Sequence, residues 1–354
     1  MDFMTLPSSA THLARAVVIA ASVLGSGLST VQAAEPDDLF LHEPETLWFV
    51  RAGGRALFNV RASISQTPTY VTPGVYEDGF VLPDINGSGS PQTWNWGYQN
   101  ASQVTGNLLW QSRTDGSPMA GQWNNESNPS FGPEIITGAE LIQFEVREKV
   151  VRVGFEVGYA FNPFSVDESS TATGTATRTF DAFATTGGIA LPTPPYSGTE
   201  AGPGPLINLS PSVSSVISSP SQATFDGELE SHIHTMKLGF WIAYPLTERL
   251  NLSGSLGYSS IFADTELNYT ESVAYTDPRI PDVAPHPQSL GSHDWRSGMY
   301  METRLEYSFS DRLAGYMGGE FQFNEDQDFS GHGREVTLDF GAQFSISAGL
   351  GFRF

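Results

Sequence analysis

Two short groups of residues contain the types needed for nucleophilic catalysis. They are Ser231, His232 and His234, and Ser292, His293 and Asp294. A serine nucleophile needs a histidine base within hydrogen-bond reach, and that base needs a carboxylate to orient it. Neighbouring residues of a strand point to opposite faces, so Ser292 and His293 are not expected to meet. We interpret both groups as polar residues at a rim and predict no enzyme.

An acidic run offers oxygen ligands of the kind that calcium prefers. It consists of Asn324, Glu325, Asp326 and Asp328. The glycine-punctuated spacing of a calcium loop is absent, as are a phosphate-cradling loop and a zinc helix motif. The chain contains no cysteine, which removes thiolate metal sites and disulfides. We therefore predict no cofactor and no metal site.

A larger set of ionisable residues recurs on the polar face of segments whose other face is apolar. The set is Arg51, Arg55, Arg61, Glu145, Arg147, Arg152, Glu156, Lys237, Glu302, Arg304, Glu306, Glu320, Asp339 and Arg353. Acids and bases nearly balance, and an unpaired charge in a narrow interior is costly. This pattern predicts a network of paired charges that fills an interior, in preference to a conduction path.

The elements that position these residues are most legible at the C-terminus. From Val336 to Phe354 every second residue is apolar, and the residues between are polar or glycine. A strand that crosses a membrane needs roughly 9–11 residues with an apolar outside and a polar inside. We predict that one apolar face runs through this whole segment.

Similar alternation divides the chain into eight strands, over residues 46–64, 135–147, 150–164, 228–244, 249–268, 294–309, 312–325 and 335–354. Short turns alternate strictly with longer connections, which cover residues 65–134, 165–227, 269–293 and 326–334. A hairpin hidden in a long connection, most readily within Thr93–Leu109, would raise the count to ten or twelve.

This arrangement resembles the bacterial outer-membrane β-barrels of the small eight-stranded OmpA/OmpX type, over residues 46–354. The resemblance implies an all-β fold, a transmembrane antiparallel up-and-down barrel with tight periplasmic turns and long extracellular loops. In that class a terminal aromatic residue is part of the signal read by the barrel assembly machinery, which here implicates Phe352 and Phe354. Outer-membrane lipids and that machinery are the partners the resemblance implies.

The first residues look like a secretory signal peptide. Ala16–Leu28 is an apolar core, and Val31-Gln32-Ala33 fits a cleavage site. We predict a signal peptide over residues 1–33, a periplasmic segment over 34–45 and a barrel over 46–354, in the bacterial outer membrane. The net charge of −22, with only two lysines, argues against nucleic acid as a partner.

The long connections are the remaining functional candidates. Residues 65–134 are rich in aromatic and small polar residues, which can bind a glycan or a protein or pack as a cap over the barrel. Residues 165–227 are rich in Thr, Ser, Gly and Pro and predict an extended or mobile surface loop. We predict a structural or surface-interaction role. The alternatives are a small porin or channel, a lipid or peptide hydrolase at the rim, and a soluble secreted β-sandwich.

Overall fold

The computed structural model describes residues 41–42, 47–66, 72–85, 91–118, 120–126, 129–185 and 190–354. The predicted signal peptide therefore lies outside the described residues. Of the predicted periplasmic segment over residues 34–45, only residues 41–42 are described. In the described ranges no helix is long and apolar enough to cross a membrane. The regular structure is almost all β-strand, with one short 3₁₀ helix, η2 (Ala101–Gln103).

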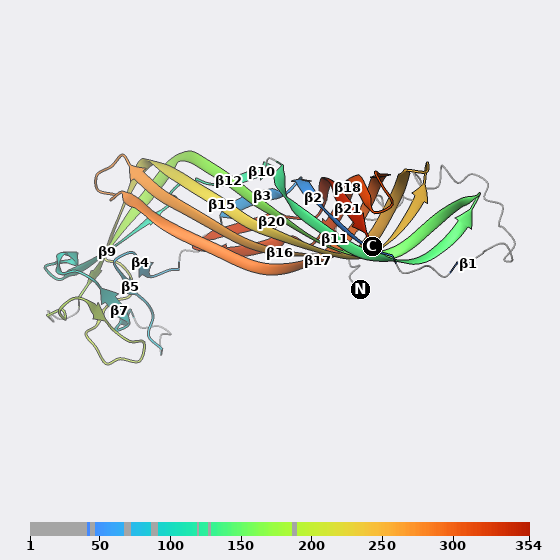
Figure 1. Ribbon diagram of the computed structural model, residues 1–354. Coiled ribbons are helices and arrows are strands. Elements are labelled where there is room, and N and C mark those ends of the chain that lie inside the picture. Colours follow the sequence, from blue (N-terminus) through green and yellow to red (C-terminus); the bar gives the residue numbers. More distant parts are fainter. Residues whose placement is uncertain are drawn as a thin grey trace, which may run out of the picture.

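Eight long strands close an antiparallel ring (Figure 1). They are β2 (Trp48–Phe58), β11 (Ser130–Val146), β12 (Lys149–Ala184), β15 (Val213–Pro245), β16 (Leu250–Tyr275), β17 (Val283–Ser308), β18 (Leu313–Asn324) and β21 (Gln343–Arg353). Each strand pairs with the next one of the ring, and β2 closes it by pairing with both β11 and β21. The predicted eight-stranded up-and-down barrel is confirmed. The segment Thr93–Leu109 adds no hairpin to this ring.

Four of these strands continue far beyond their predicted ends. β12 has 36 residues, β15 has 33, and β16 and β17 have 26 each. The prediction of an extended or mobile loop over residues 165–227 is therefore wrong for most of that segment. Thr occupies every second position from residue 171 to 179, which suits a strand, because β-branched side chains favour extended backbone.

The other strands of the ring change faces part of the way along. β2 is followed by β3 (Arg61–Gln66), and β21 is preceded by β20 (Arg334–Asp339). At the first break Asn59 adopts a left-handed φ of 64°. Beyond the second break Val336, Leu338 and Phe340 point inward and are fully buried, whereas Leu350 and Phe352 point outward and are exposed. The predicted single apolar face from Val336 to Phe354 is therefore wrong, because the break exchanges inside and outside.

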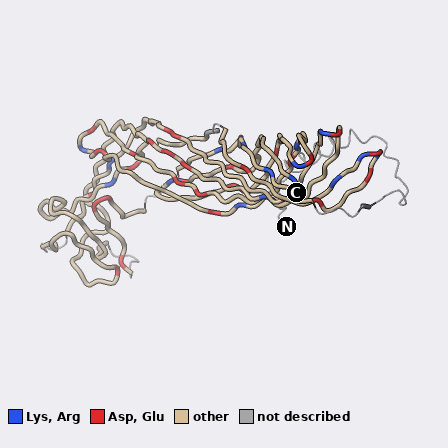
Figure 2. Tube along the Cα trace, in the orientation of Figure 1, with Lys and Arg blue, Asp and Glu red and all other residues tan. Residues whose placement is uncertain are grey.

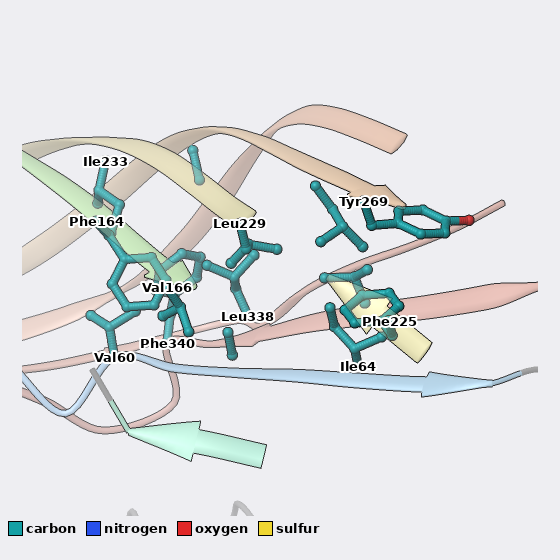
Figure 3. Packing of buried hydrophobic residues seen from close by; sticks show 14 of the residues in the cluster. Val60, Ile64, Phe164, Val166, Phe225, Leu229, Ile233, Tyr269, Leu338 and Phe340 are labelled. Carbon is teal, nitrogen blue, oxygen red and sulfur yellow. The ribbon is translucent and has the colours of Figure 1, made fainter. Parts of the chain in front are cut away.

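Beyond the breaks the ring opens into two sheets that face each other. One sheet contains β10 (Trp123–Glu126), β3, β20 and β19 (Gln327–Gly331), in that order. The other is formed by the distal parts of β12, β15, β16 and β17. Apolar side chains from both sheets fill the space between them (Figure 3). We call this part of the molecule the stalk, its filling the stalk core, and the ring on the other side of the breaks the membrane barrel.

A third body lies at the end of the stalk that is remote from the described termini (Figure 1). Its strands are β4 (Val75–Tyr76), β5 (Gly79–Val81), β6 (Gln92–Thr93), β7 (Trp96–Tyr98), β8 (Val104–Thr105), β9 (Leu108–Asp115), β13 (Tyr196–Ser197) and β14 (Ile207–Asn208). They surround a separate core that includes Trp96, Tyr98 and Phe183. We call this body the head. At the opposite end β1 (Leu41–His42) pairs with β11.

Candidate functional site

The outer face of the membrane barrel is a continuous apolar surface. On β15 alone Leu238 is 56% exposed and Phe240 is 67% exposed, although both are large and apolar. Such side chains are stable on the outside only against lipid or another apolar surface. Aromatic residues bound this belt at both ends. They include Trp48, Tyr307, Phe309, Phe352 and Phe354 at the short turns, and Tyr159, Phe161, Phe262 and Trp295 toward the stalk.

The interior of the membrane barrel is filled by paired charges. Lys237 Nζ lies 2.8 Å from Glu134 Oε1 and also binds Glu320, and Glu302 lies 3.7 Å away. Arg304 binds Glu302 at 2.7 Å and Glu156 at 3.3 Å.

Three more arginines join the same network. Arg51 binds Glu306 at 3.0 Å, Arg55 binds Glu320 at 2.9 Å, and Arg353 also binds Glu306. Six carboxylates face six bases along the interior. They are Glu134, Glu140, Glu156, Glu302, Glu306 and Glu320, and Arg51, Arg55, Arg152, Lys237, Arg304 and Arg353. Among these described interior residues the acids and the bases are equal in number.

The structure brings most of the predicted interior residues together and moves a few outside. Arg147 lies exposed in the turn between β11 and β12 with φ 51°, and Glu145 is exposed beside it. Asp339 and Arg61 are partners on β20 and β3, beyond the breaks, where this row points outward. The prediction of an interior position is wrong for these four, because it assumed unbroken alternation.

Two interior residues escaped the sequence analysis. Glu134 was placed before the start of its strand, and β11 in fact begins at Ser130. Glu140 lies next to a bulge between Glu140 and Ile142, which breaks the alternation there. A carboxylate two positions before Ile136, on the same face, was the available signal for Glu134.

Little free space remains at the short-turn end of the interior. The hollow that Arg51, Glu140, Arg152, Glu306 and Arg353 help to line measures about 20 Å³, which is room for about one water molecule. The aromatic side chains of Phe49 and Trp241 pack edge to face beside it. The network therefore leaves no wide conduit in this part of the barrel.

Beyond the charge network, the apolar side chains of the stalk core fill the interior of the stalk. Phe225, Leu229, Ile233, Leu267 and Phe340 are fully buried in it (Figure 3). Phe225 stacks on Tyr269 with ring centroids 5.4 Å apart.

One base lies inside this apolar core and was not foreseen from the sequence. Arg334 of β20 is 1% exposed, with its guanidinium 4.7 Å from the ring centre of Phe225 and 5.6 Å from that of Tyr269. It donates to the carbonyl oxygens of Ala120 and Gly121, and it pairs with Glu271 at 3.0 Å. Arg334 thus joins the two sheets of the stalk, because Phe225, Tyr269 and Glu271 belong to the opposite sheet.

In the first rim group the serine and the histidines lie on opposite faces of β15. Ser231 points inward and shares a hydrogen bond with Thr265, whereas His232 and His234 point outward. The His234 ring lies among aromatic rings, and its Nδ1 is 2.8 Å from the Tyr159 hydroxyl.

In the second rim group Ser292 lies opposite the buried Thr265, whereas His293 lies opposite Asp264, an exposed residue that is also the cross-strand partner of His232. Asp294 pairs with Arg296 at 2.9 Å. The members of the acidic run have separate partners. Asn324 points into the barrel, Asp326 accepts from the Phe340 backbone, and Asp328 accepts from Thr337. Among the described residues no three His, Asp or Glu side chains are placed to hold a metal ion.

The head is fixed to the stalk by strand pairing and by a buried polar cluster. β9 pairs with β12 from Asp115 to Leu108. Asp181 of β12 accepts hydrogen bonds from the Tyr76 hydroxyl at 2.7 Å and the Ser214 hydroxyl at 2.6 Å. Burial and the neighbouring carboxylate raise the pKa of Tyr76 well above its usual value, so its hydroxyl remains a donor.

The aromatic residues of the predicted long loop mostly pack within the head. Trp96 and Tyr98 are almost fully buried, and the Trp96 Nε1 donates to the Pro205 carbonyl at 2.7 Å. The described head residues 72–85, 91–115 and 190–212 contain one base, Arg113 of β9, which pairs with Asp115 at 3.3 Å. They carry the acids Glu77, Asp78, Asp84, Asp115 and Glu200 (Figure 2). The head thus presents an acidic or neutral surface.

Comparisons with known proteins give matches among solved structures alone. No protein-family model and no curated protein matches the chain. Among solved structures the chain is similar to Ail, the attachment invasion locus protein of Yersinia pestis, with 9% identity, coverage of 88% of this chain and 100% of that chain, and a TM-score of 0.26. The chain is also similar to the outer membrane protease OmpT from Escherichia coli, with 10% identity, coverage of 89% of this chain and 99% of that chain, and a TM-score of 0.31.

A third similar structure is the P. putida toluene transporter TodX, with 8% identity, coverage of 88% and 91%, and a TM-score of 0.18. The closed ring, the polar interior and the lipid-facing belt carry the structural assignment on their own. The protein folds as a closed, eight-stranded antiparallel up-and-down β-barrel with the polar interior and apolar outer belt of a barrel that crosses a membrane.

Proposed function

We propose that this protein is a closed barrel that holds its head away from the outer-membrane surface for contact with an external partner. The observation that supports this proposal is the double filling of the interior. Paired charges fill the membrane barrel, and apolar side chains fill the stalk. A pathway for solutes would have to cross both fillings, and the apolar one offers nothing to replace the hydration of an ion.

The stalk and the head suit a role in display. The two sheets of the stalk bury a common core, and β9 continues the pairing of the stalk into the head. A rigid connection lowers the entropy lost when the head binds a partner. We therefore propose the head and the outside of the stalk as the surfaces for the predicted surface-interaction role.

The charge of the head narrows the class of partner. Its described part carries five carboxylates and one base, Arg113, which is already paired with Asp115. The excess of carboxylates disfavours sulfate, phosphate or carboxylate groups as ligands. We infer a neutral glycan, or a protein surface that is neutral or basic, as the partner. Anionic polysaccharides and nucleic acid would be repelled.

Placement in the membrane is part of the same proposal. The short turns and the described ends of the chain face the periplasm, and the head faces the outside. Export depends on the signal peptide over residues 1–33, and assembly depends on Phe352 and Phe354. Both of these aromatic side chains are exposed at the end of β21, where the assembly machinery can contact them.

Conductance of the refolded full chain in planar bilayers tests the closed barrel. Heat-modifiable migration on a gel serves as the check of folding. We expect no discrete steps, whereas reproducible steps of porin size would show that the barrel is a channel and would overturn the proposal.

Binding to immobilised ligands tests the role of the head. Neutral glycans and basic peptides are the probes, and heparin is the anionic control. Binding to heparin alone would contradict the inferred class of partner.

A further inference from the structure

An open hollow crosses the outer face of the stalk sheet that β12, β15, β16 and β17 form. It measures about 760 Å³ and is lined by three consecutive residues from each of the four strands. They are residues 167–169, 226–228, 268–270 and 287–289. Clefts that bind ligands measure about 300–1,000 Å³, so this hollow is large enough to bind one. We call it the stalk groove.

Strand register shows that the stalk groove runs across the strands between two rows of side chains. One row is Asp167, Glu228, Asn268 and Ser289, and the other is Ser169, Asp226, Thr270 and Pro287. Both rows lie on the outer face, whereas Tyr269 of the row between them points into the stalk core. Neighbouring strands are about 4.8 Å apart, so four strands give a groove about 14 Å long. An extended peptide covers that length with about four residues.

The stalk groove is acidic and has no base among its lining residues. Asp167 and Glu228 are direct partners on two strands, and Glu168 and Asp226 also line the hollow. The four strands contain no lysine or arginine over residues 153–177, 213–236, 250–275 and 283–295. Like charges directly opposite each other destabilise a sheet, and repulsion from Glu230 and Asp167 raises the pKa of Glu228. A cationic occupant removes this repulsion.

The spacing of the carboxylates favours a peptide as that cation. Asp226 and Glu228 lie on opposite walls, about 6.7 Å apart along their strand, and in the described part of the chain no three such groups converge to hold a metal ion. Several arginine or lysine side chains of one peptide can pair with separate carboxylates, and a guanidinium binds a carboxylate through two parallel hydrogen bonds.

The other half of the stalk groove, on β16 and β17, suits the backbone of a peptide. Asn268, Thr270 and Ser289 supply neutral donors and acceptors there. A sugar finds less support, because Tyr269, the one aromatic residue of the lining, is 3% exposed and presents no ring for stacking.

We infer that the stalk groove docks an extended basic segment of an external protein, whose arginine or lysine side chains pair with Asp167, Asp226 and Glu228. The inference rests on the proposed role of the protein in surface contact. It narrows the partner of the stalk from a neutral or basic protein to a basic one, and it assigns the contact to one place on the outside of the stalk.

Binding of a fluorescein-labelled hexa-arginine peptide to the refolded full chain in detergent micelles tests the charge of the groove. Fluorescence anisotropy at physiological salt measures the Kd. Asp226→Asn/Glu228→Gln removes two charges from the groove, and Glu335→Gln/Glu248→Gln removes two exposed charges elsewhere. We expect the Kd to rise at least about tenfold in the first double variant and less than about twofold in the second, because salt screens charges that the peptide does not contact.

A second pair of variants tests the shape of the groove at constant charge. Asn268→Trp fills the groove, and Thr173→Trp places the same side chain at an exposed position of β12 outside it. We expect a rise in Kd of at least about tenfold for Asn268→Trp alone. Equal weakening by the two charge variants would show that the peptide follows the overall charge of the chain. Unchanged binding to Asn268→Trp would place the peptide elsewhere, and either result would overturn the inference.

Two further results would overturn the inference without touching the proposed function. One is a closed barrel that shows no conductance and binds no peptide. The other is calcium binding that is lost in Asp226→Asn/Glu228→Gln while the peptide does not bind, which would assign the groove to a metal ion. Conductance steps together with groove-dependent peptide binding would overturn the closed barrel and leave the inference standing.

Discussion

The membrane barrel and the stalk use the same strands with opposite arrangements of polar and apolar side chains. On β15 the inward residues change from Lys237 in the barrel to Leu229 and Phe225 in the stalk, while the outward residues change from Leu238 to Glu228. β15 keeps its alternation throughout, so the exchange is encoded in its residue types. The surroundings of each part decide which face is apolar, because lipid accepts apolar side chains and water does not.

In the shorter strands the apolar side chains also change from the outer to the inner face, but a break in the backbone causes the change. Their residue types keep one apolar face, and a break in the backbone turns that face from outside to inside. Asn59 provides the break between β2 and β3, and the segment between Phe340 and Gln343 provides it between β20 and β21. Two mechanisms thus produce one boundary, at which the lipid-facing barrel becomes a stalk with an apolar core.

The largest effect should come from the base at the centre of the charge network. Lys237→Met removes the cation that Glu134, Glu302 and Glu320 share. Breaking a buried ion pair on one side costs about 3–5 kcal/mol of unfolding free energy. Urea unfolding, followed by heat-modifiable migration, measures this loss.

Lys149→Met is the matched control for this prediction, because Lys149 lies at the surface, where it donates to two carbonyl oxygens and lies 5.0 Å from the centre of the Tyr244 ring. We expect a small change in that variant. The Lys237→Met barrel that does fold should still show no conductance, since the stalk core is intact. New conductance steps would place the barrier in the charge network and contradict the contrast drawn here.

An arginine introduced on the outer face should destabilise the membrane barrel much more than the stalk. Leu238→Arg places it against lipid, and Gln222→Arg places it on the same face of β15 in the stalk, where Gln222 is exposed. An arginine at the bilayer midplane costs about 2–4 kcal/mol, whereas an exposed surface substitution changes stability by about 0.5 kcal/mol or less. Urea unfolding in lipid vesicles compares the two variants. Equal losses would mean that lipid reaches the stalk.

The sequence was sufficient for the barrel and insufficient for the stalk. Alternation over β15 to β18 located each strand, since an apolar outer face and a polar inner face have a period of two. The distal part of β12 was not recognised, because Thr, Ser and Gly also make up loops. The breaks were missed because a face exchange depends on one residue of backbone, which residue types do not show. Arg334 was missed for a related reason: its partners Phe225 and Tyr269 come from distant parts of the chain.

Loss of Arg334 should have an intermediate effect that is confined to the stalk. Arg334→Met keeps most of the apolar contact with Phe225 and Tyr269 but leaves Glu271 and two carbonyl oxygens without their donor. Such unsatisfied groups cost about 1–3 kcal/mol. Limited proteolysis should then cut the stalk earlier, while the membrane barrel keeps its heat-modifiable migration. Loss of that migration would show that the two regions unfold as one unit.

The smallest effect concerns the acidic outer surface of the stalk. Repulsion from Glu230 and Asp167 raises the pKa of Glu228 above its ordinary value of 4.5. The folded chain therefore holds the proton of Glu228 more tightly than the unfolded chain, and the penalty from this repulsion disappears as the pH falls through the folded pKa. Glu228→Gln should slightly raise the urea midpoint at pH 7 and at low salt, and the gain should vanish below about pH 4.

Added salt should also reduce that gain, because these carboxylates are exposed to solvent. Glu248→Gln, in the turn between β15 and β16, is the control and should leave the midpoint unchanged. A gain for Glu228→Gln that persists at low pH would have to come from something other than charge. Packing would then contribute to stability at the outer face of the stalk as it does in the stalk core. The two faces of the stalk would differ less in what stabilises them than their residue types suggest.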